Sequence, residues 1–524
     1  MKRIIIAIIA LTTISYALSL GNDFQAHDDT LLITQNPAAQ GLSVSNIKTA
    51  FTTFDPELYI PITLLSYQVE YSLFGLTPFI FHFTSLLLHI GSAILVLLIV
   101  YRLSKEHLMI ATAVSLIFAL HPLNAEAVAW AAARKDVLSS FFLLASIWAY
   151  LKSEDHRKWF KWSVVFFALG LMAKVSIVIL PVLLLLIDDY RGRRSGFIKR
   201  SIPFAALSLI FGAIALLGKQ NQITELSLIQ NILLWCKSAS FYLWKLIVPK
   251  DLTIIYNQDT VPEITSAEFL LPVVLVLLMI TLGFIAYKRA KVISLGIAWY
   301  LVCLLPSFAT FWKNGFIFTA SDRYAYIAII GILFALMTLI IPRLKHINII
   351  GSVVIAVLVI LTAMQSLTWK DTITLYERSI DLNPRPVLQL NNLGTYYSDQ
   401  GSTKLAREYY DQALELDQRI PQTLANIAKI LRKDGFHKEA AEWFEKSITM
   451  IPEERQLLEE DIVGYFFLGE YHETRGDIDK AFTMFETAAT RASQYPIPHL
   501  NLGIMYQKYK RVNEAKSAFA AAID

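Results

Sequence analysis

The sequence predicts an all-α protein with two parts: a polytopic membrane domain of about eleven helices, and a solenoid of helical repeats behind it. Of its 524 residues, 55% are hydrophobic and only 17% are charged, whereas soluble domains carry about 25% charged residues. The first 368 residues contain a series of apolar runs that approach the roughly 20 residues needed to cross a bilayer. After Trp369 the composition becomes polar and periodic.

The apolar runs predict the order of the membrane helices. The first run follows Met1-Lys2-Arg3 like a secretory signal, but it lacks a clear small-residue cleavage site, so we interpret it as an uncleaved span. The segment 227–248 is amphipathic, and we expect it to lie at the membrane interface, with a twelfth span as the alternative. The predicted spans are 4–20, 79–101, 108–121, 137–151, 160–173, 175–188, 203–218, 268–287, 293–311, 324–342 and 348–367.

Basic residues predict the orientation of these spans. They are concentrated in every second loop, for example in Lys152–Lys161 and Arg191–Arg200, and such loops face the cytoplasm. The first outer loop, 21–78, then lies outside, and its segments Ser43–Phe54 and Pro61–Phe74 have the spacing of helices that rest on a membrane surface. We expect a bacterial inner-membrane protein whose C-terminal region is periplasmic.

The C-terminal region repeats with a period near 34 residues. Pairs of a large and a small residue recur at steps of about 34, 41 and 34 residues, which is the signature of tetratricopeptide repeats. The pairs are Leu393-Gly394, Ile427-Ala428, Leu468-Gly469 and Leu502-Gly503. We therefore predict a membrane domain over 1–368 and a repeat domain over 369–524, with repeats at about 387–419, 420–453, 461–494 and 496–524.

Asp28 and Asp29 are the candidate catalytic residues. They follow the first span directly, and a carboxylate near lipid can acquire the raised pKa that suits a general base. Proximity of two like charges can raise one pKa further. The alternative is an ordinary solvated loop, or a cap for a short helix.

The second outer loop carries a dense group of ionisable residues. Charges at the membrane are usually functional or paired, so we predict that His121, Glu126 and Arg134 help to bind the donor of a transfer reaction. The alternative for two of them is a structural ion pair between Arg134 and Glu126. Lys135 and Asp136 complete the group.

Lys174, Arg323 and Tyr326 are further candidates for binding a donor phosphate or its sugar. Lys174 interrupts an apolar stretch and Arg323 opens a span from outside, and arginine binds phosphate oxygens bidentately. Against this, Lys174 could snorkel to water and Asp322 could neutralise Arg323. His82 and His89 are expected to be packing residues.

Other functional classes find little support. The sequence has no glycine-rich phosphate loop, nucleophile elbow or dense metal-ligand cluster, which argues against a nucleotide-driven pump or a serine hydrolase. The net charge of +4 is too small to indicate a nucleic-acid partner. No cofactor is predicted with certainty, and a need for a divalent cation is left open. Cys236 and Cys303 are expected to be reduced core residues.

The order of several short motifs resembles a known family. After Asp28-Asp29 come Tyr59-Ile60-Pro61, Leu73-Phe74-Gly75-Leu76, Phe81-His82, Leu87-Leu88-His89, Phe118-Ala119-Leu120-His121-Pro122, Glu126-Ala127-Val128-Ala129-Trp130, Arg134-Lys135-Asp136, Asp322-Arg323-Tyr324 and Trp369. This order, followed by the repeats, resembles the transmembrane and tetratricopeptide repeat-containing O-mannosyltransferases and their bacterial relatives, within the type C glycosyltransferase superfamily.

The resemblance implies a polyprenyl-phosphate-linked sugar as donor, a protein hydroxyl as acceptor, and the acidic pair as the source of the catalytic base. The chain departs from the family pattern at Ile60, where the family tends to have arginine, at Ala133, where it usually has glycine, and at Asp322, where it commonly has glutamate. The departure at Ile60 bears most on the identity of the donor.

Together these observations predict an inverting glycosyltransferase. It would move mannose or another hexose from a polyprenyl-phosphate donor to Ser/Thr hydroxyls of exported proteins, and the repeats would bind the acceptor and raise its effective concentration. One alternative is transfer to a lipid or glycan, of the lipid A or O-antigen type. Another is a non-catalytic scaffold anchored in the membrane.

Overall fold

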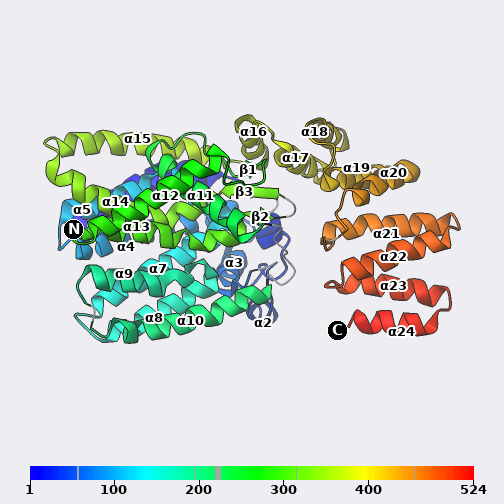
Figure 1. The fold of residues 1–524 in the computed structure, drawn as a ribbon, viewed down its shortest axis with the longest axis horizontal. Coiled ribbons are helices and arrows are strands. Elements are labelled where there is room, and N and C mark those ends of the chain that lie inside the picture. Colours follow the sequence, from blue (N-terminus) through cyan, green and yellow to red (C-terminus); the bar gives the residue numbers. More distant parts are fainter. Residues whose placement is uncertain are drawn as a thin grey trace. The chain divides into compact units, whose positions relative to one another are not determined.

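The computed structural model describes residues 1–26, 28–55, 58–193, 195–218, 226–313, 316–453 and 455–523. It is predominantly helical, so the predicted all-α class is confirmed. The chain divides into two compact units, Met1–Arg378 and Ser379–Asp524 (Figure 1). The division falls inside α16 (Thr372–Leu382), a helix that the sequence prediction assigned to the repeat domain.

In the first unit, each of the eleven predicted spans overlaps an α-helix, in part or in full. Seven described helices are long and apolar enough to cross a membrane, and a bent pair, Leu108–Leu120 with Pro122–Ala129, adds an eighth. This count is roughly consistent with the prediction, and the protein is a membrane protein. The helices are α1 (Lys2–Tyr16), α4 (Pro78–Leu103), α5 (Leu108–Leu120), α7 (Arg134–Lys152), α8 (Lys158–Ala173), α9 (Leu180–Tyr190), α10 (Phe197–Gly218), α12 (Ala267–Ala286), α13 (Lys291–Cys303), α14 (Ala325–Ile340) and α15 (Ile347–Leu367).

Small residues allow the membrane helices to pack closely. Gly296 of α13 faces Gly331 of α14, and a methyl group added to Gly296 would lie 2.6 Å from the carbonyl oxygen of Gly331. Such contacts drive helix association in lipid, where burial of apolar surface alone gives little advantage. One large hydrophobic core connects most of these helices.

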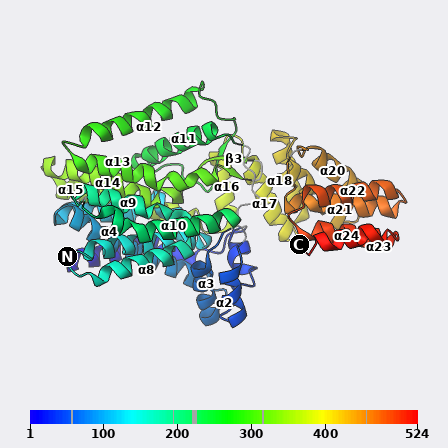
Figure 2. The ribbon, with the colours of Figure 1, turned by 60° about the horizontal axis from the view of Figure 1, so that its bottom comes forward.

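The first outer loop forms the predicted surface helices, α2 (Val44–Thr52) and α3 (Pro61–Phe74). They lie side by side at one end of the first unit (Figure 2). The Ser43 side chain caps α2 by accepting from Asn46 N at 3.0 Å. The described part of the loop thus forms regular structure that packs against the membrane helices α4, α7 and α8 through α3.

A small antiparallel sheet, absent from the sequence prediction, joins two other loops. Its strands β1 (Tyr256–Gln258), β2 (Trp312–Lys313) and β3 (Phe316–Ala320) lie in the order β1-β3-β2. The amphipathic segment 227–248 forms α11 (Leu228–Ile247), which packs against α12 and buries Tyr242 in the core. Its place relative to the bilayer stays a prediction.

The second unit consists of helical pairs that follow the predicted repeats. Small residues sit where the helices of a pair cross: a methyl group added to Gly469 would lie 2.6 Å from the Phe485 ring. The helices are α17 (Val387–Asp399), α18 (Thr403–Leu416), α19 (Pro421–Lys433), α20 (His437–Thr449), α21 (Glu459–Thr474), α22 (Ile478–Arg491), α23 (Pro496–Lys508) and α24 (Val512–Ala521).

Candidate active site

The two aspartates of the first loop occupy different environments. Asp29 is fully buried, and its two carboxylate oxygens accept hydrogen bonds from Gln25 N and Ala132 N, each at 2.7 Å. Burial raises the pKa of Asp29 to about 7, although the two N–H groups oppose the shift. The Asp28 side chain is 38% exposed and lies 3.8 Å from Lys135 Nζ. Asp29 therefore anchors the loop, and Asp28 is the member that a substrate can reach.

The segment predicted to be the second outer loop supplies the backbone group that holds Asp29 in place. It runs through η3 (Pro122–Asn124), α6 (Ala125–Ala129) and η4 (Ala131–Ala133) before α7 begins. Its alanines are buried, so other segments approach its backbone closely. Ala132 N donates to Asp29, while Ala131 O accepts from Tyr67 OH at 2.9 Å and Ala132 O accepts from Lys135 Nζ at 2.9 Å. One short segment thus holds Asp29 directly, holds the Lys135 side chain that lies beside Asp28, and contacts helix α3 through Tyr67.

Arg134 is part of this scaffold. Its side chain is fully buried and forms an ion pair with Glu70 of α3 at 2.8 Å. Its Nε donates to Ser85 Oγ at 2.9 Å, and Nη2 donates to Phe81 O, both in α4. The ion pair considered from the sequence, Arg134 with Glu126, is therefore wrong. Arg134 ties α3, α4 and α7 together, and its role in donor binding stays a prediction.

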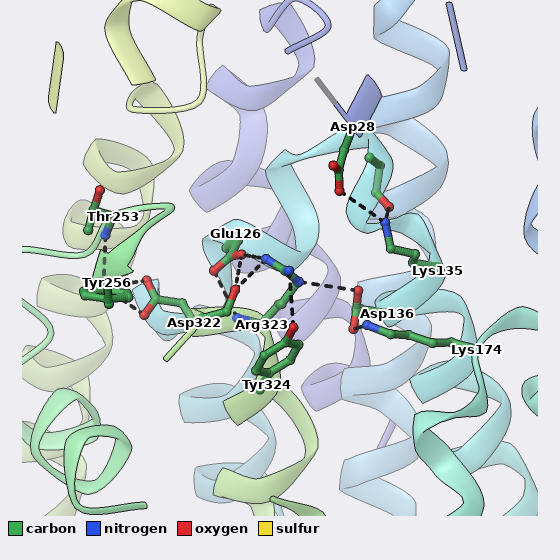
Figure 3. Close-up of polar contacts among 12 residues, drawn as sticks. Asp28, Glu126, Lys135, Asp136, Lys174, Thr253, Tyr256, Asp322, Arg323 and Tyr324 are labelled. Atoms are coloured by element: carbon green, nitrogen blue, oxygen red, sulfur yellow. Dashed lines mark hydrogen bonds and ion pairs between the residues drawn. The ribbon is translucent and has the colours of Figure 1, made fainter. Parts of the chain in front are cut away.

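A chain of alternating charges lies beside Asp28 (Figure 3). Glu126 forms an ion pair with Arg323 Nη1 and also accepts from Ser321 Oγ at 2.8 Å. Arg323 Nε lies 3.9 Å from Asp136 Oδ2, and Asp136 Oδ1 forms an ion pair with Lys174 Nζ. Lys174 thus has a partner inside the protein instead of extending freely to water.

Asp322 does not neutralise Arg323, contrary to the alternative raised from the sequence. It accepts from Tyr256 OH at 3.0 Å and points toward β1, as Figure 3 shows. The Arg323 guanidinium lies instead 5.2 Å from the ring of Trp130, which stacks on Trp369. Such cation–π contacts hold the cation in place without removing its charge.

A small, mostly apolar pocket includes Lys174 of this chain of charges in its lining. It is lined by Leu58, Tyr59, Ile60, Lys174, Val175 and Phe211, among others. Among the lining residues that the structure describes, Lys174 is the charged one. The pocket is small, about 30 Å³, so it has room for the end of an apolar group beside Lys174 and not for a long chain.

The structure does not bring His121 and Tyr326 into the charged cluster. His121 Nε2 lies 3.1 Å from Leu246 O, and Nδ1 accepts from Leu123 N at 3.2 Å. Tyr326 OH lies 2.6 Å from His89 Nδ1 in the core, which agrees with the packing role expected of His89. Both residues make helix-packing contacts, and their part in donor binding stays a prediction.

Several residues of the site were missed from the sequence. Glu70 is the clearest, because a single acidic residue within an otherwise apolar surface helix signals a buried partner. Tyr256 and Ser321 gave no such signal, because Tyr256 begins the three-residue strand β1 and Ser321 lies in the turn after β3. Within the described residues, no group of three or more His, Cys, Asp and Glu side chains could hold a metal ion.

Comparison with known proteins identifies the relatives of this chain. Residues 69–217 match the family described as dolichyl-phosphate-mannose-protein mannosyltransferase, and residues 390–419 and 421–454 match tetratricopeptide repeats. A protein O-mannosyl-transferase of Caenorhabditis elegans is 24% identical over 454 residues, covering 80% of this chain and 64% of the relative. The human protein O-mannosyl-transferase TMTC3 is 20% identical, covering 89% of this chain and 57% of the relative.

The chain therefore spans about 55–64% of the length of the curated relatives that it matches first. Among solved structures, a crystal structure of MamA is 20% identical and covers 29% of this chain and 85% of its own, with a TM-score of 0.24. The fold and the matches define a polytopic membrane protein with a tetratricopeptide repeat region. The chain is a distant relative of the repeat-containing protein O-mannosyltransferases, which confirms the resemblance drawn from its motifs.

Proposed function

We propose that the protein is an inverting glycosyltransferase that moves a hexose from a polyprenyl-phosphate donor to Ser/Thr hydroxyls of exported proteins. The observation that carries this proposal is the division of labour between two adjacent carboxylates. Asp29 anchors the loop, while Asp28 is accessible beside Lys135, the neighbour of Asp136, which pairs with Lys174 and lies 3.9 Å from Arg323. An accessible carboxylate near fixed cations suits a hydroxyl acceptor and an anionic leaving group.

In the proposed reaction, Asp28 accepts the proton of the acceptor hydroxyl. The hydroxyl oxygen forms a bond to the anomeric carbon while the bond from that carbon to the phosphate oxygen breaks. The phosphate leaves with the bonding electron pair, and Lys174 and Arg323 stabilise the charge that develops on it. A single displacement of this kind inverts the anomeric configuration.

The pocket at Lys174 supports a lipid-linked donor. Its apolar lining suits the part of a prenyl chain next to the phosphate, and Lys174 suits the phosphate itself. We place the site on the periplasmic side of a bacterial inner membrane, as the basic loops predict. The repeats would hold an extended acceptor segment and raise its effective concentration at the membrane.

The test is transfer by the purified full chain in proteoliposomes, supplied with a panel of synthetic prenyl-phosphate sugars. Each donor is paired with Ser/Thr peptides from exported proteins or with lipid and glycan acceptors, and products are identified by mass spectrometry. We expect glycosylated peptides with inverted anomeric configuration. Products formed only on lipid or glycan acceptors would favour the alternative acceptor class, and no product with any donor would contradict a glycosyltransferase.

A further inference from the structure

Asp136 occupies the position between the two cations that face the proposed donor site. It lies in the first turn of α7 and is nearly buried. One carboxylate oxygen, Oδ1, pairs with Lys174, and the other, Oδ2, lies 3.9 Å from Arg323 Nε. Figure 3 shows the carboxylate between the two cationic side chains. The Asp136 carboxylate therefore occupies the position between Lys174 and Arg323 where the phosphate of a ligand would otherwise bind.

The contact with Arg323 is incomplete. Asp136 Oδ2 and Arg323 Nε are both buried, and neither has a hydrogen-bond partner among the described residues. A separation of 3.9 Å is too long for a hydrogen bond, and buried charged atoms without one are costly. Arg323 Nε therefore lacks an acceptor, and a phosphate oxygen would supply one if the Asp136 carboxylate moved aside.

The local charges are already balanced without a ligand. Lys135, Lys174 and Arg323 contribute three positive charges, and Asp28, Glu126 and Asp136 contribute three negative charges. A phosphate that enters this cluster must weaken the hold of Asp136 on the cations. Glu126 is fixed more firmly, because it also accepts from Ser321 Oγ and Arg323 N. Asp136 is the carboxylate that can be displaced.

We propose that Asp136 is a resident counter-ion that competes with the lipid phosphate and disfavours the spent carrier relative to the donor. This inference rests on the proposed function. The donor is a phosphodiester with one negative charge, whereas transfer leaves a phosphate monoester, whose second ionisation has a pKa near 6 and which approaches two charges at neutral pH. A fixed carboxylate beside the site repels the second charge. Asp136 thus acts as a positioning and selectivity residue that promotes release of the product.

The experiment measures binding of two prenyl lipids to the full chain in nanodiscs at pH 8. One is a prenyl monophosphate with two charges, and the other is a prenyl methyl phosphate with one charge. The wild-type protein should bind the singly charged lipid at least as tightly as the doubly charged one. In Asp136→Asn the dissociation constant for the monophosphate should fall about tenfold or more, so that the preference reverses.

Matched variants separate this role from a merely structural one. Asp136→Glu keeps the charge and should behave as wild type. Asp188→Asn removes a different buried carboxylate, which pairs with Arg200, and should leave both affinities unchanged. The proposal is overturned if folded Asp136→Asn binds the monophosphate no more tightly than wild type. If that variant does not fold, a wild-type preference of tenfold or more for the doubly charged lipid overturns it.

The outcome is distinguishable from failure of the proposed function. Tighter monophosphate binding by Asp136→Asn, in a protein that transfers no sugar to any acceptor, would retain the counter-ion role and reject the transferase. Transfer by the wild type together with weaker monophosphate binding by the variant would retain the transferase and reject the counter-ion role. A prenyl alcohol serves as the uncharged control, and its affinity should not change in the variant.

Discussion

The two ends of α7 carry ion pairs of opposite character. At its N-terminal end, Asp136 pairs with Lys174 and Arg323 with Glu126, and these side chains are 1–17% exposed. Near its C-terminal end, Arg102 pairs with Asp155, and their side chains are 31% and 45% exposed. Exposed pairs contribute little to stability, whereas a buried pair becomes costly when one partner is removed. The comparison teaches that the first cluster is held in a fixed arrangement suited to binding. The second cluster consists of solvent-exposed charges, as expected for the basic loops that are predicted to set the orientation in the membrane.

The largest expected effect on stability comes from Arg323→Met. It leaves Glu126, which is 1% exposed, without its cation, and an unpaired buried charge costs about 3–5 kcal/mol. Chemical unfolding in detergent micelles measures the loss. A change below about 1 kcal/mol would remove the distinction between the two ends of α7.

Arg134→Lys should cause the next largest loss of stability. A lysine can reach Glu70 but cannot also donate to Ser85 and Phe81 O, so about 1–3 kcal/mol of stability should be lost. Because Arg134 fixes α3 beside the loop of Asp28, the turnover number should fall more than the apparent donor affinity. Glu70→Gln is the matched variant, because it removes the charge from the other partner of the same ion pair. Wild-type turnover in Arg134→Lys would show that this anchor has no part in positioning the loop.

The raised pKa of Asp29 predicts that the free energy of unfolding depends on pH. Its pKa is raised from 3.8 to about 7 in the folded protein, so the folded state retains a proton that the unfolded state loses between about pH 4 and 7. This group's contribution is therefore largest at low pH. The free energy of unfolding should decrease with a slope of up to about 1.4 kcal/mol per pH unit across that window.

Asp29→Asn should abolish that slope, and thermal or chemical unfolding across pH 4–8 measures it. Transfer should show the opposite trend, since the ionised carboxylate is the better acceptor for the two backbone N–H groups that anchor the loop. We expect wild-type activity to rise as the pH passes 7. Identical pH profiles in wild type and variant would contradict the assignment of the anchor to Asp29.

The smallest effect should come from Arg102→Gln at the opposite end of α7. Its partner Asp155 is exposed to solvent, so the free energy of unfolding should change by less than about 1 kcal/mol. Transfer should stay at the wild-type rate. A large loss of transfer here would indicate that the exposed end also takes part in the reaction.

The elements of the fold follow from local sequence patterns. Apolar runs predicted the membrane helices, helical spacing predicted α2 and α3, and a period near 34 residues predicted the repeats. These patterns are local, because each element depends mainly on residues within it. The strands of the small sheet are too short to produce a recognisable alternation.

The partners within the site do not follow from local patterns. Arg134 and Glu70 are 64 positions apart, and Arg323 and Glu126 are 197 apart. Sequence proximity suggested that Arg134 pairs with Glu126, but the turn of the chain through η4 directs Arg134 toward α3. Which charges meet depends on how the helices assemble. The difference between Asp28 and Asp29 likewise depends in part on a distant loop, because Ala132 N is one of the two backbone groups that hold Asp29.

The most direct measurement of the central claim compares sugar transfer and thermal unfolding in Asp28→Asn and Asp29→Asn under identical conditions. If Asp28 is the base, its variant keeps the wild-type unfolding temperature and loses transfer by about 10²–10⁴-fold, while the Asp29 variant changes in stability. Full transfer by a folded Asp28→Asn protein would contradict the account.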